Sequence, residues 1–448
     1  MYTDSERRPV DGNGSSIVKE LELTDLDIDQ QLLGLPGISL VVFTSVGCAS
    51  CRWARQQLPG WHLPVDRVCW VDAGHNGGAV ERYRIFHLPA LFLVCEGQFF
   101  WAITDTSYSI RPRRMPKPGA QPNTRGFAMT AVAAPSPRIG IIGTGAIGGY
   151  YGLMLARAGF DVHFLLRSEY AAVSRHGLHV NSTVHGQLHL HPVQAYASAA
   201  DMPPCDWLLV GTKSTGNVDL APTIAQVAAP DAKVVLLQNG LDVEDSLREH
   251  LPPSLHLLGG LCYIGVHRSA PGVVEHQALG RVNLGYHSGT AANDEVQQQA
   301  IVEAGAGLFH QAGIESQAMA NVHLARWHKL VWNVPFNGLS VLLGTGTTAM
   351  MADESSRELI QALMAEVVQG AHACGHEIPA SYAGQMFAMT ETMDDYLPSM
   401  YHDHLHKRPL ELAAIYARPL AAAKAAGCEL PRMQALYQAL SFIDRHNR

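Results

Sequence analysis

The sequence has no excess of positive charge and no long apolar segment. Its formal net charge is −8, and charged residues make up 16% of the 448 positions, so the basic surface that nucleic acids require is missing. No apolar stretch reaches the ~20 residues of a membrane-spanning helix. The first residues, MYTDSERRPVDGNGSS, contain no apolar segment typical of a secretory signal. We therefore predict a cytoplasmic protein that binds neither nucleic acid nor membranes.

Cysteine is also scarce, with eight in the whole chain. Six of them stand alone in apolar or mixed surroundings, which is typical of reduced, buried thiols rather than a disulfide scaffold. Cys48 and Cys51 alone form a motif. The hydrophobic content of 47% indicates a globular protein, and the length predicts about three domains.

The clearest break in the pattern is a stretch rich in Pro, Gly, Arg and Ala, which predicts a linker at 109–137. Strand-like segments before it predict an α/β module at 16–108. Apolar strands that alternate with helical segments predict an α/β domain with a parallel sheet at 138–290. Apolar residues spaced three and four apart then predict an α-helical domain at 291–448.

A glycine loop follows the strand-like segment RIGII. Gly143, Gly145 and Gly148 form GxGxxG at the start of a helix, where they allow a tight turn, the approach of a pyrophosphate and close helix–strand packing. Free N–H groups at the helix start favour an anion. We therefore predict a Rossmann dinucleotide-binding domain, whose cofactor-binding loop consists of Gly143, Thr144, Gly145, Ala146, Ile147 and Gly148.

The end of the second strand bears on the cofactor. Enzymes specific for NAD place an acidic residue there, whereas an arginine accommodates the 2′-phosphate of NADP. Arg167 and Ser168 occupy this point, and a guanidinium binds phosphate through two hydrogen bonds. We predict NADP, with NAD left open because Glu169 follows directly.

Five landmarks in order resemble the ketopantoate reductases (2-dehydropantoate 2-reductases) over residues 138–445. They are RIGIIGTGAIGG, Lys213 in VGTKSTGN, the QNG that contains Asn239, W-x-K-L-x-x-N-x-x-x-N from Trp327, and SMYHDHLHKRPLE with Ser399 and Glu411. The resemblance implies NADPH-dependent reduction of a branched 2-oxo acid, most simply ketopantoate. Reduction of another 2-oxo acid, as by a D-2-hydroxy acid dehydrogenase, stays open.

Lys329, Asn333 and Asn337 are four residues apart and form one stripe if helical. A ketone that is being reduced develops negative charge on oxygen, and a positioned ammonium stabilises that charge and donates the proton. The resemblance implies that Lys329 is this acid, and that Asn333, Asn337 and Ser399 bind the substrate. Pro335 lies inside the stripe, so the helix is expected to kink or begin there.

The resemblance gives three further residues a role. Glu411 bonds to substrate or cofactor hydroxyls and helps orient the lysine, Asn239 lies near nicotinamide and substrate, and Lys213 lies near the cofactor. Outside the family pattern, a lysine on an amphipathic helix is a surface charge, and Glu411 is an ordinary helix start. Tight cofactor binding without turnover, as in an NADP-sensing protein, is therefore an alternative.

The first module contains C-x-x-C after an apolar strand and at the head of a helix, with Pro89 just before another strand. This arrangement resembles a thioredoxin domain, which implies that Cys48 is the attacking thiol and Cys51 the resolving thiol. Gly47 and Val42 replace residues usual in that family, so a docking module without redox activity is an alternative. Thiol–disulfide exchange as the main activity is another.

His402, His404 and His406 have a spacing that suggests metal binding, but they coincide with the family's substrate segment and lack a completing ligand set. We expect no metal site. A homodimer through the C-terminal helices, and contacts of the thioredoxin-like module with other proteins, are further hypotheses.

Overall fold

The computed structural model describes residues 19–45, 49–58, 65–83, 85, 90–95, 98–103 and 137–447. The chain divides into two compact units, Met1–Phe127 and Ala128–Arg448. Cys48, Pro89 and all but the last residue of the predicted linker lie outside the described residues. In the part of the chain that is described, no helix has the length and apolar character needed to cross a membrane.

The first unit contains a five-stranded mixed sheet of order β1-β3-β2-β4-β5. β1, β3 and β2 are parallel, while β4 runs antiparallel to both β2 and β5. The central strand is buried on both faces, with Val41 and Phe43 packed on the side of α1 and α3, and Leu40 and Val42 on the side of α2. The elements are β1 (Lys19–Leu23), α1 (Ile28–Gly34), β2 (Ile38–Thr44), α2 (Ala49–Gln57), β3 (Arg67–Asp72), α3 (Gly77–Arg82), β4 (Ala90–Cys95) and β5 (Gln98–Ile103).

The second unit is built on a ten-stranded sheet of order β10-β7-β6-β11-β12-β13-β14-β8-β9, with β15 paired to β14. β10 to β13 are mutually parallel in that order, which confirms the predicted parallel α/β sheet. Its strands are β6 (Arg138–Ile142), β7 (Asp161–Leu165), β8 (Leu178–Ser182), β9 (Gly186–Leu190), β10 (Gln194–Tyr196), β11 (Cys205–Val210), β12 (Ala228–Leu236), β13 (His256–Ala270), β14 (Val273–Ser288) and β15 (Ala318–Met319). β7, which follows β6 in the chain, lies on one side of β6 in the sheet, whereas β11 lies on its other side. The connections that leave β6 and β11 therefore diverge, which makes a crevice at the carboxyl ends of these two strands.

Helices cover both faces of this sheet. Alternate residues of β6 face opposite cores, with Ile141 toward the side of α4 and α8 and Ile142 toward the side of α6 and α7. These helices are α4 (Ala146–Arg157), α5 (Tyr170–His176), α6 (Asn217–Val227), α7 (Asp245–Arg248) and α8 (Glu295–Gln311), with a short 3₁₀ turn at Ser214–Gly216. Val302 and Phe309 of α8 belong to the sheet's core. The helical domain predicted from residue 291 therefore includes α8, although α8 packs on the sheet.

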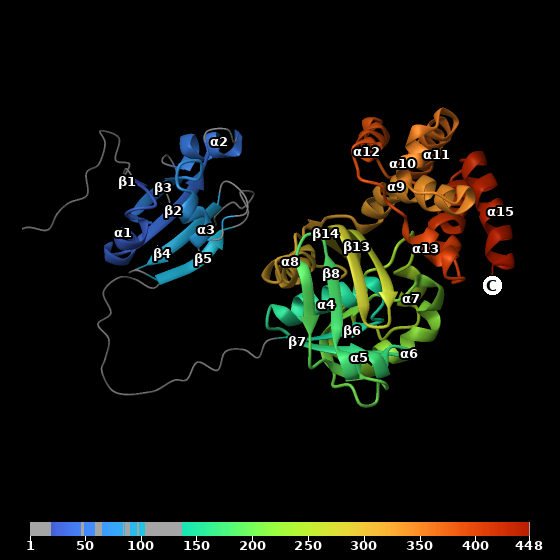
Figure 1. Ribbon diagram of the computed structural model, residues 1–448, viewed down its shortest axis with the longest axis horizontal. Coiled ribbons are helices and arrows are strands. Elements are labelled where there is room, and N and C mark those ends of the chain that lie inside the picture. The colour runs from blue at the N-terminus through green and yellow to red at the C-terminus, as the bar shows by residue number, and fades with distance from the viewer. Residues whose placement is uncertain are drawn as a thin grey trace, which may run out of the picture. The chain divides into compact units, whose positions relative to one another are not determined.

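The remaining helices form a separate all-α region with its own core, visible in orange and red in Figure 1. They are α9 (Val322–Leu343), α10 (Thr347–Ala352), α11 (Glu354–Ala373), α12 (Ser381–Glu391), α13 (Ser399–Leu405), a π-helical turn (Ala413–Ala417), α14 (Arg418–Ala425) and α15 (Pro431–His446).

α9 is the helix that contains the predicted substrate stripe. The side chain of Asn321 caps its start by accepting from the Leu324 N–H at 2.9 Å, and Gly344 in the left-handed region ends it. The helix runs through Pro335 instead of beginning there. The carbonyl of Val334, the residue before Pro335, accepts a hydrogen bond of 2.7 Å from the Tyr416 hydroxyl.

Candidate active site

The glycine loop joins β6 to α4, as the sequence predicted. Gly143 has φ +87°, and a Cβ there would lie 2.9 Å from the backbone nitrogen of Thr212. A Cβ on Gly148 would collide with the Gly143 carbonyl, whereas Gly145 faces open space at the N-cap of α4. The three positions thus allow a tight turn, an open approach to the helix start and close packing, which is the geometry that a pyrophosphate requires.

A cavity of about 400 Å³ opens beside this loop. It is lined by Ile142, Gly143, Thr144, Gly145, Leu165, Leu166, Arg167, Ser168, Glu169, Ala197, Ala199, Thr212, Gly216, Asp219, Leu220, Thr223 and Arg268. Gly143, Thr144, Gly145 and Arg167 of the predicted cofactor set are therefore on its wall. Ala146 and Ile147 instead pack against the sheet's core, and Gly148 is buried.

The charged rim of the cavity contains a residue that sequence reasoning missed. Arg167 and Ser168 are exposed. Glu169 is buried, and its carboxylate accepts from the Arg268 guanidinium and, at 3.1 Å, from the Gly272 N–H. Arg268 comes from β13, about a hundred residues away, so no local pattern could have indicated it. The Glu169 carboxylate is thus already hydrogen-bonded to other groups of the protein.

Lys213 binds two buried carboxylates from the helical region. Its Nζ lies 2.8 Å from Asp403 Oδ2 and 2.9 Å from Glu411 Oε2, and both acids are at most 2% exposed. Burial alone would lower the pKa of Lys213, but the charges of Glu411 and Asp403 outweigh it and raise that pKa. Arg408 Nε also bonds Asp403, at 3.0 Å. Asp403 was not singled out as a site residue, although it lies within the family-like segment.

Lys329 lies on the face of α9 that meets β13. Its Nζ donates to the Cys262 carbonyl at 2.6 Å and lies 5.5 Å from the centre of the Tyr263 ring. Burial lowers the pKa of Lys329 to about 8, with the Cys262 thiol and the Glu411 carboxylate acting in the opposite direction. Glu411 therefore acts on Lys329 electrostatically, while its ion pair is made with Lys213.

The two asparagines of the stripe are both buried but differ in their contacts. Asn337 Oδ1 accepts from the Ser399 hydroxyl and the Met400 N–H, each at 3.3 Å, so it is tied to the start of α13. Asn333 is 5% exposed, and its Nδ2 has no hydrogen-bond partner within the described chain. A buried amide donor without a partner is costly, so Nδ2 of Asn333 is left with an unused donor beside Lys329.

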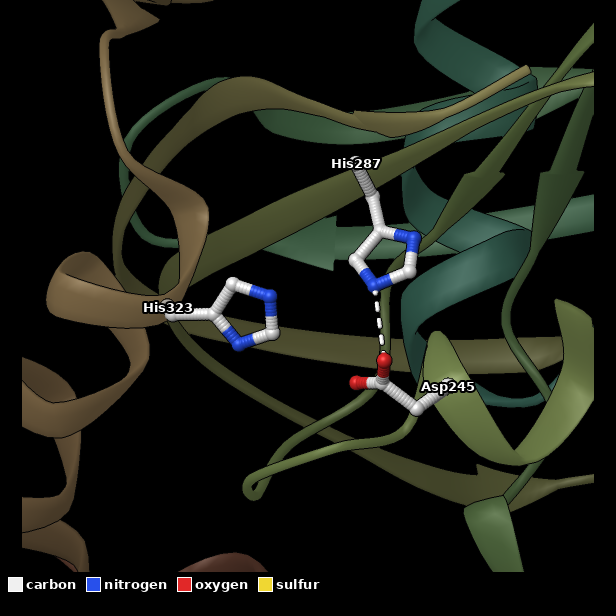
Figure 2. A group of neighbouring side chains, drawn as sticks. All are labelled: Asp245, His287 and His323. Carbon is white, nitrogen blue, oxygen red and sulfur yellow. Dashed lines mark hydrogen bonds and ion pairs between the residues drawn. The ribbon is translucent and has the colours of Figure 1, made fainter. Parts of the chain in front are cut away.

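Of the three histidines considered for metal binding, His402 and His406 make local contacts, whereas Nδ1 of His404 is buried without a partner among the described residues. The His402 ring stacks on His267 with centroids 4.6 Å apart, and His406 Nδ1 bonds the His402 carbonyl at 2.7 Å. A different group brings ligand-type atoms together, formed by Asp245, His287 and His323 (Figure 2). It lies beside the QNG loop and not in the substrate stripe.

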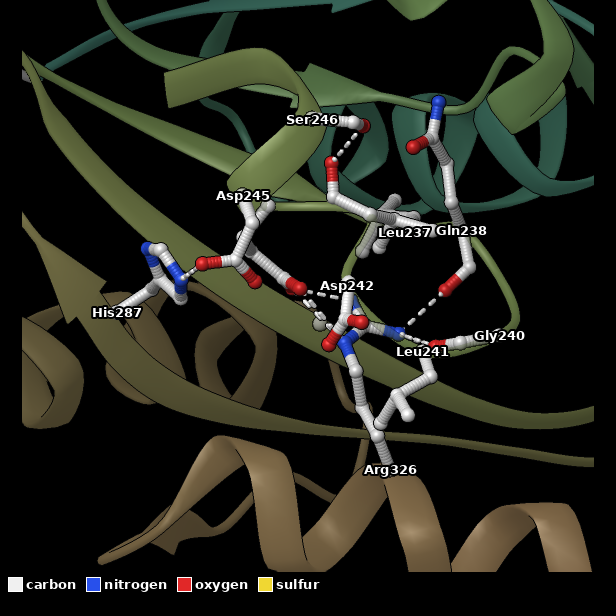
Figure 3. Close-up of polar contacts among 12 residues, drawn as sticks. Leu237, Gln238, Gly240, Leu241, Asp242, Asp245, Ser246, His287 and Arg326 are labelled. Atoms are coloured by element: carbon white, nitrogen blue, oxygen red, sulfur yellow. Dashed lines mark hydrogen bonds and ion pairs between the residues drawn. The ribbon is translucent and has the colours of Figure 1, made fainter. Parts of the chain in front are cut away.

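The QNG loop is held by a buried arginine that sequence reasoning missed. Figure 3 shows Arg326 reaching from α9 into the loop, where its Nη1 donates to the carbonyls of Gln238 and Gly240, each at 3.0 Å. Its Nε bonds both oxygens of Glu244, at 2.8 and 3.0 Å. The half-buried Asn239 sits between the two fixed carbonyls. Arg326 thus sets the position of Asn239 relative to α9.

The same loop packs against the turn that follows Glu411. Gly240 has φ +101°, and a Cβ there would lie 2.6 Å from the backbone carbon of Ala414. The Leu241 N–H donates to the Ala414 carbonyl at 2.8 Å. Only glycine fits this approach, which brings Asn239 and Glu411 to one junction of sheet and helices.

Comparison with known proteins decides the family. Residues 139–289 match the model of "Ketopantoate reductase PanE/ApbA", and residues 321–444 match its C-terminal domain. A 2-dehydropantoate 2-reductase of Nostoc sp. is 41% identical over 312 residues, which is 69% of this chain and 95% of the relative. The chain belongs to the ketopantoate reductase family. It is an oxidoreductase that acts on CH–OH groups, in a family that uses NAD(P).

Solved structures of this family show the same fold. The 2-dehydropantoate 2-reductase of Geobacter metallireducens is 36% identical with a TM-score of 0.63, covering 68% of this chain and 99% of that one. The enzyme from Methylococcus capsulatus is 32% identical with a TM-score of 0.62, covering 69% and 97%. A D-mandelate dehydrogenase, solved with NADH and anilino(oxo)acetate, shares the fold at 20% identity and a TM-score of 0.61.

Proposed function

We propose that the Ala128–Arg448 unit is an NADPH-dependent 2-oxo acid reductase that converts ketopantoate to pantoate, as in pantothenate biosynthesis in the cytoplasm. One observation carries the proposal. The Lys329 ammonium and Nδ2 of Asn333, which has no partner among the described residues, lie one turn apart on a single helix, in a chain 41% identical to a 2-dehydropantoate 2-reductase. A half-buried acid beside a buried amide donor suits a ketone flanked by a carboxylate.

In this proposal the protein's own residues bind the substrate and move the proton. Bound NADPH supplies the two electrons of the reduction. Lys329 donates its Nζ proton to the carbonyl oxygen as negative charge develops there. Asn333 and Asn337 hold the hydroxyl and carboxylate ends of the substrate, with Ser399 assisting. Asn239 lies toward the nicotinamide, and the Lys213–Glu411 pair orders the nearby hydroxyls.

The cofactor cavity favours NADP over NAD on electrostatic grounds. An NAD site needs a free carboxylate to accept from the ribose 2′-hydroxyl, but Glu169 already accepts from Arg268 and the Gly272 N–H. Arg167 and Arg268 on the wall supply positive charge for a 2′-phosphate. The glycine loop with Thr144 would hold the pyrophosphate, and Ala146 and Ile147, whose side chains pack on the core, would contribute only their backbone N–H groups at the start of α4.

A substrate panel tests this function. Purified protein should oxidise NADPH with ketopantoate at a kcat/KM at least tenfold above that with straight-chain or aromatic 2-oxo acids. A higher value for another branched or aromatic 2-oxo acid would make the enzyme a different D-2-hydroxy acid dehydrogenase. Cofactor binding without turnover on any oxo acid would instead indicate an NADP-sensing protein.

For the first unit we propose a thioredoxin-like domain over residues 16–108, joined by the linker at 109–137. The proposal is supported by a helix, α2, that follows the central strand and carries Cys51, which is 1% exposed, in its first turn. Thiol–disulfide exchange would use Cys48 as the attacking thiol. Insulin reduction that is lost in Cys48→Ser would support this second activity, and inert cysteines would leave a module that docks other proteins.

The oligomeric state is part of the same proposal. The solved structures include a ketopantoate reductase of Staphylococcus aureus described as dimeric, at 19% identity. We propose a homodimer through the C-terminal helices, which analytical ultracentrifugation of the full chain tests directly.

A further inference from the structure

Asp245, His287 and His323 are brought together by three different elements. Asp245 begins α7, His287 is near the end of β14, and His323 is the second residue of α9. Each offers one ligand-type atom, and these atoms all lie within 4.8 Å of one another. Figure 2 shows the His323 ring facing the hydrogen-bonded His287–Asp245 pair. We name this group the junction triad.

His287 is already oriented as a metal ligand is. Its Nδ1 lies 2.8 Å from the Ser288 hydroxyl, and its Nε2 lies 3.2 Å from Asp245 Oδ1. Metal-binding histidines use the second ring nitrogen in this way, which fixes the ring and points the other nitrogen at the ion. The side chain is 8% exposed while that of Asp245 is 51% exposed. The triad is thus rigid on one side and open to entering ions on the other.

His323 supplies an imidazole that the fold does not otherwise use. Within the described chain neither of its ring nitrogens has a hydrogen-bond partner, and its one ring contact is with His287, at 5.4 Å between centroids. Asp242 lies close enough to interact electrostatically with both His323 and Asp245, and Arg418 acts on the same carboxyl. An imidazole that has no hydrogen-bond partner among the described residues, and that faces a carboxylate and a second imidazole, has the composition of a metal site.

We propose that the junction triad binds one zinc ion through Asp245, His287 and His323, with water completing the shell. Two imidazoles and one carboxylate favour zinc over magnesium or calcium, which prefer oxygen ligands. Zinc bonds of 2.0–2.1 Å place tetrahedral ligands about 3.3 Å apart. The ligand atoms, now within 4.8 Å of one another, would have to draw together to that spacing when zinc binds.

Zinc at this position ties the sheet to the helix that contains Lys329. His323 lies six residues before Lys329, which is about 9 Å along the helix axis, so the ion stabilises the junction and takes no part in proton transfer. Because zinc binds only the folded arrangement, it should raise the temperature of unfolding. That readout does not depend on the reductase activity or on its substrate.

The test uses the full chain with Cys48→Ser and Cys51→Ser, because a dithiol would itself bind zinc. After treatment with a chelator, zinc is titrated against a chromophoric competitor. One equivalent should bind, with the temperature of unfolding raised. Asp245→Asn, His287→Ala and His323→Ala should each weaken binding at least ~10-fold. His310→Ala, an exposed histidine at the end of α8, is the matched control.

X-ray absorption of the loaded protein provides a second measurement. It should report nitrogen and oxygen neighbours only, with imidazole scattering from two rings. Asp245 is exposed, so Asn at this position keeps the fold even if a histidine variant does not. Zinc binding that is absent, or equally strong in Asp245→Asn and the parent, would overturn the proposal.

Discussion

Lys329 is held in a setting where its proton is easily released. The side chain is half-buried, its ammonium donates to the Cys262 carbonyl, and desolvation lowers its pKa to about 8. An acid is most effective when its pKa is near the working pH, because it is then both protonated and a good donor. A solvated surface lysine would lack this property.

Lys329→Ala should lower kcat by ~10²–10⁴ while the affinity for NADPH stays unchanged, because the general acid is lost and the cofactor contacts are kept. Lys329→Arg should not restore activity, since a guanidinium keeps its proton. Steady-state rates and a cofactor titration measure both effects. Lys424→Ala, at an exposed lysine of α14, is the control, and wild-type rates in Lys329→Ala would exclude the assigned role.

The pH profile follows from the same pKa. Since Lys329 must be protonated to act, kcat/KM for reduction should fall as the pH rises through about 8. Oxidation of the hydroxy acid needs the neutral amine, so its rate should rise over the same range. A pH series in both directions tests this. A reduction rate that stays flat up to pH 10 would contradict the assignment.

Arg268 should contribute to the choice of cofactor. Arg268→Gln leaves the Glu169 carboxylate uncompensated on the cavity wall, so kcat/KM with NADPH should fall about 10- to 100-fold, the value of one charge-assisted hydrogen bond, while that with NADH changes less. The double variant Arg268→Gln/Glu169→Gln, with a neutral pair, should recover part of the loss. Arg175→Gln, at an exposed arginine of α5, is the control. Equal losses with both cofactors would show that the effect is only structural.

At the scale of elements, α9 does most to assemble the site. It contains Lys329 and Asn333, and its Arg326 fixes the QNG loop of the sheet. Arg326 and Glu244 are 2% and 0% exposed. If one of them were removed, solvent water could therefore not hydrogen-bond to the other. The position of the loop therefore depends on one buried ion pair.

Arg326→Met should destabilise the second unit by about 3–5 kcal/mol, because it leaves the Glu244 charge buried and unpaired. Arg326→Met combined with Glu244→Leu should regain much of that loss, since no charge is then stranded. Urea unfolding followed by near-UV circular dichroism measures both. A single variant as stable as the parent would mean that the pair is not what secures the loop.

The sequence predicted elements better than the contacts between them. The strand, glycine loop and helix at residues 138–157 could be read locally, because turn chemistry and apolar period are encoded in neighbouring residues. Arg268, Arg326 and Asp403 could not, since each meets a partner 82 to 190 residues away. Pairs that are this far apart in the chain cannot be predicted from the pattern of neighbouring residues.

At the scale of the whole molecule, two units have separate cores. The family model and the relatives account for the second unit. A fold prediction from the glycine loop and the five landmarks was confirmed for the α/β and α-helical parts of that unit. The predicted thioredoxin-like module stays a prediction, since its Cys48 and Pro89 lie outside the described residues.

Because the cores are separate, the cysteines should not affect the reductase. Cys48→Ser/Cys51→Ser should leave kcat/KM for ketopantoate unchanged, under both reducing and oxidising conditions. The same assay on the parent protein with and without a dithiol is the control. A rate that depends on the dithiol in the parent and not in the variant would instead show that the two units are functionally coupled.

Ketopantoate reduction by this protein is best measured through the stoichiometry of the reaction. Full-length protein is incubated with NADPH and excess ketopantoate, and the product is identified by mass spectrometry against authentic pantoate. We expect one pantoate to be formed per NADPH consumed, and both to be lost in Lys329→Ala. NADPH consumption without pantoate, or pantoate formation that persists without Lys329, would contradict this expectation.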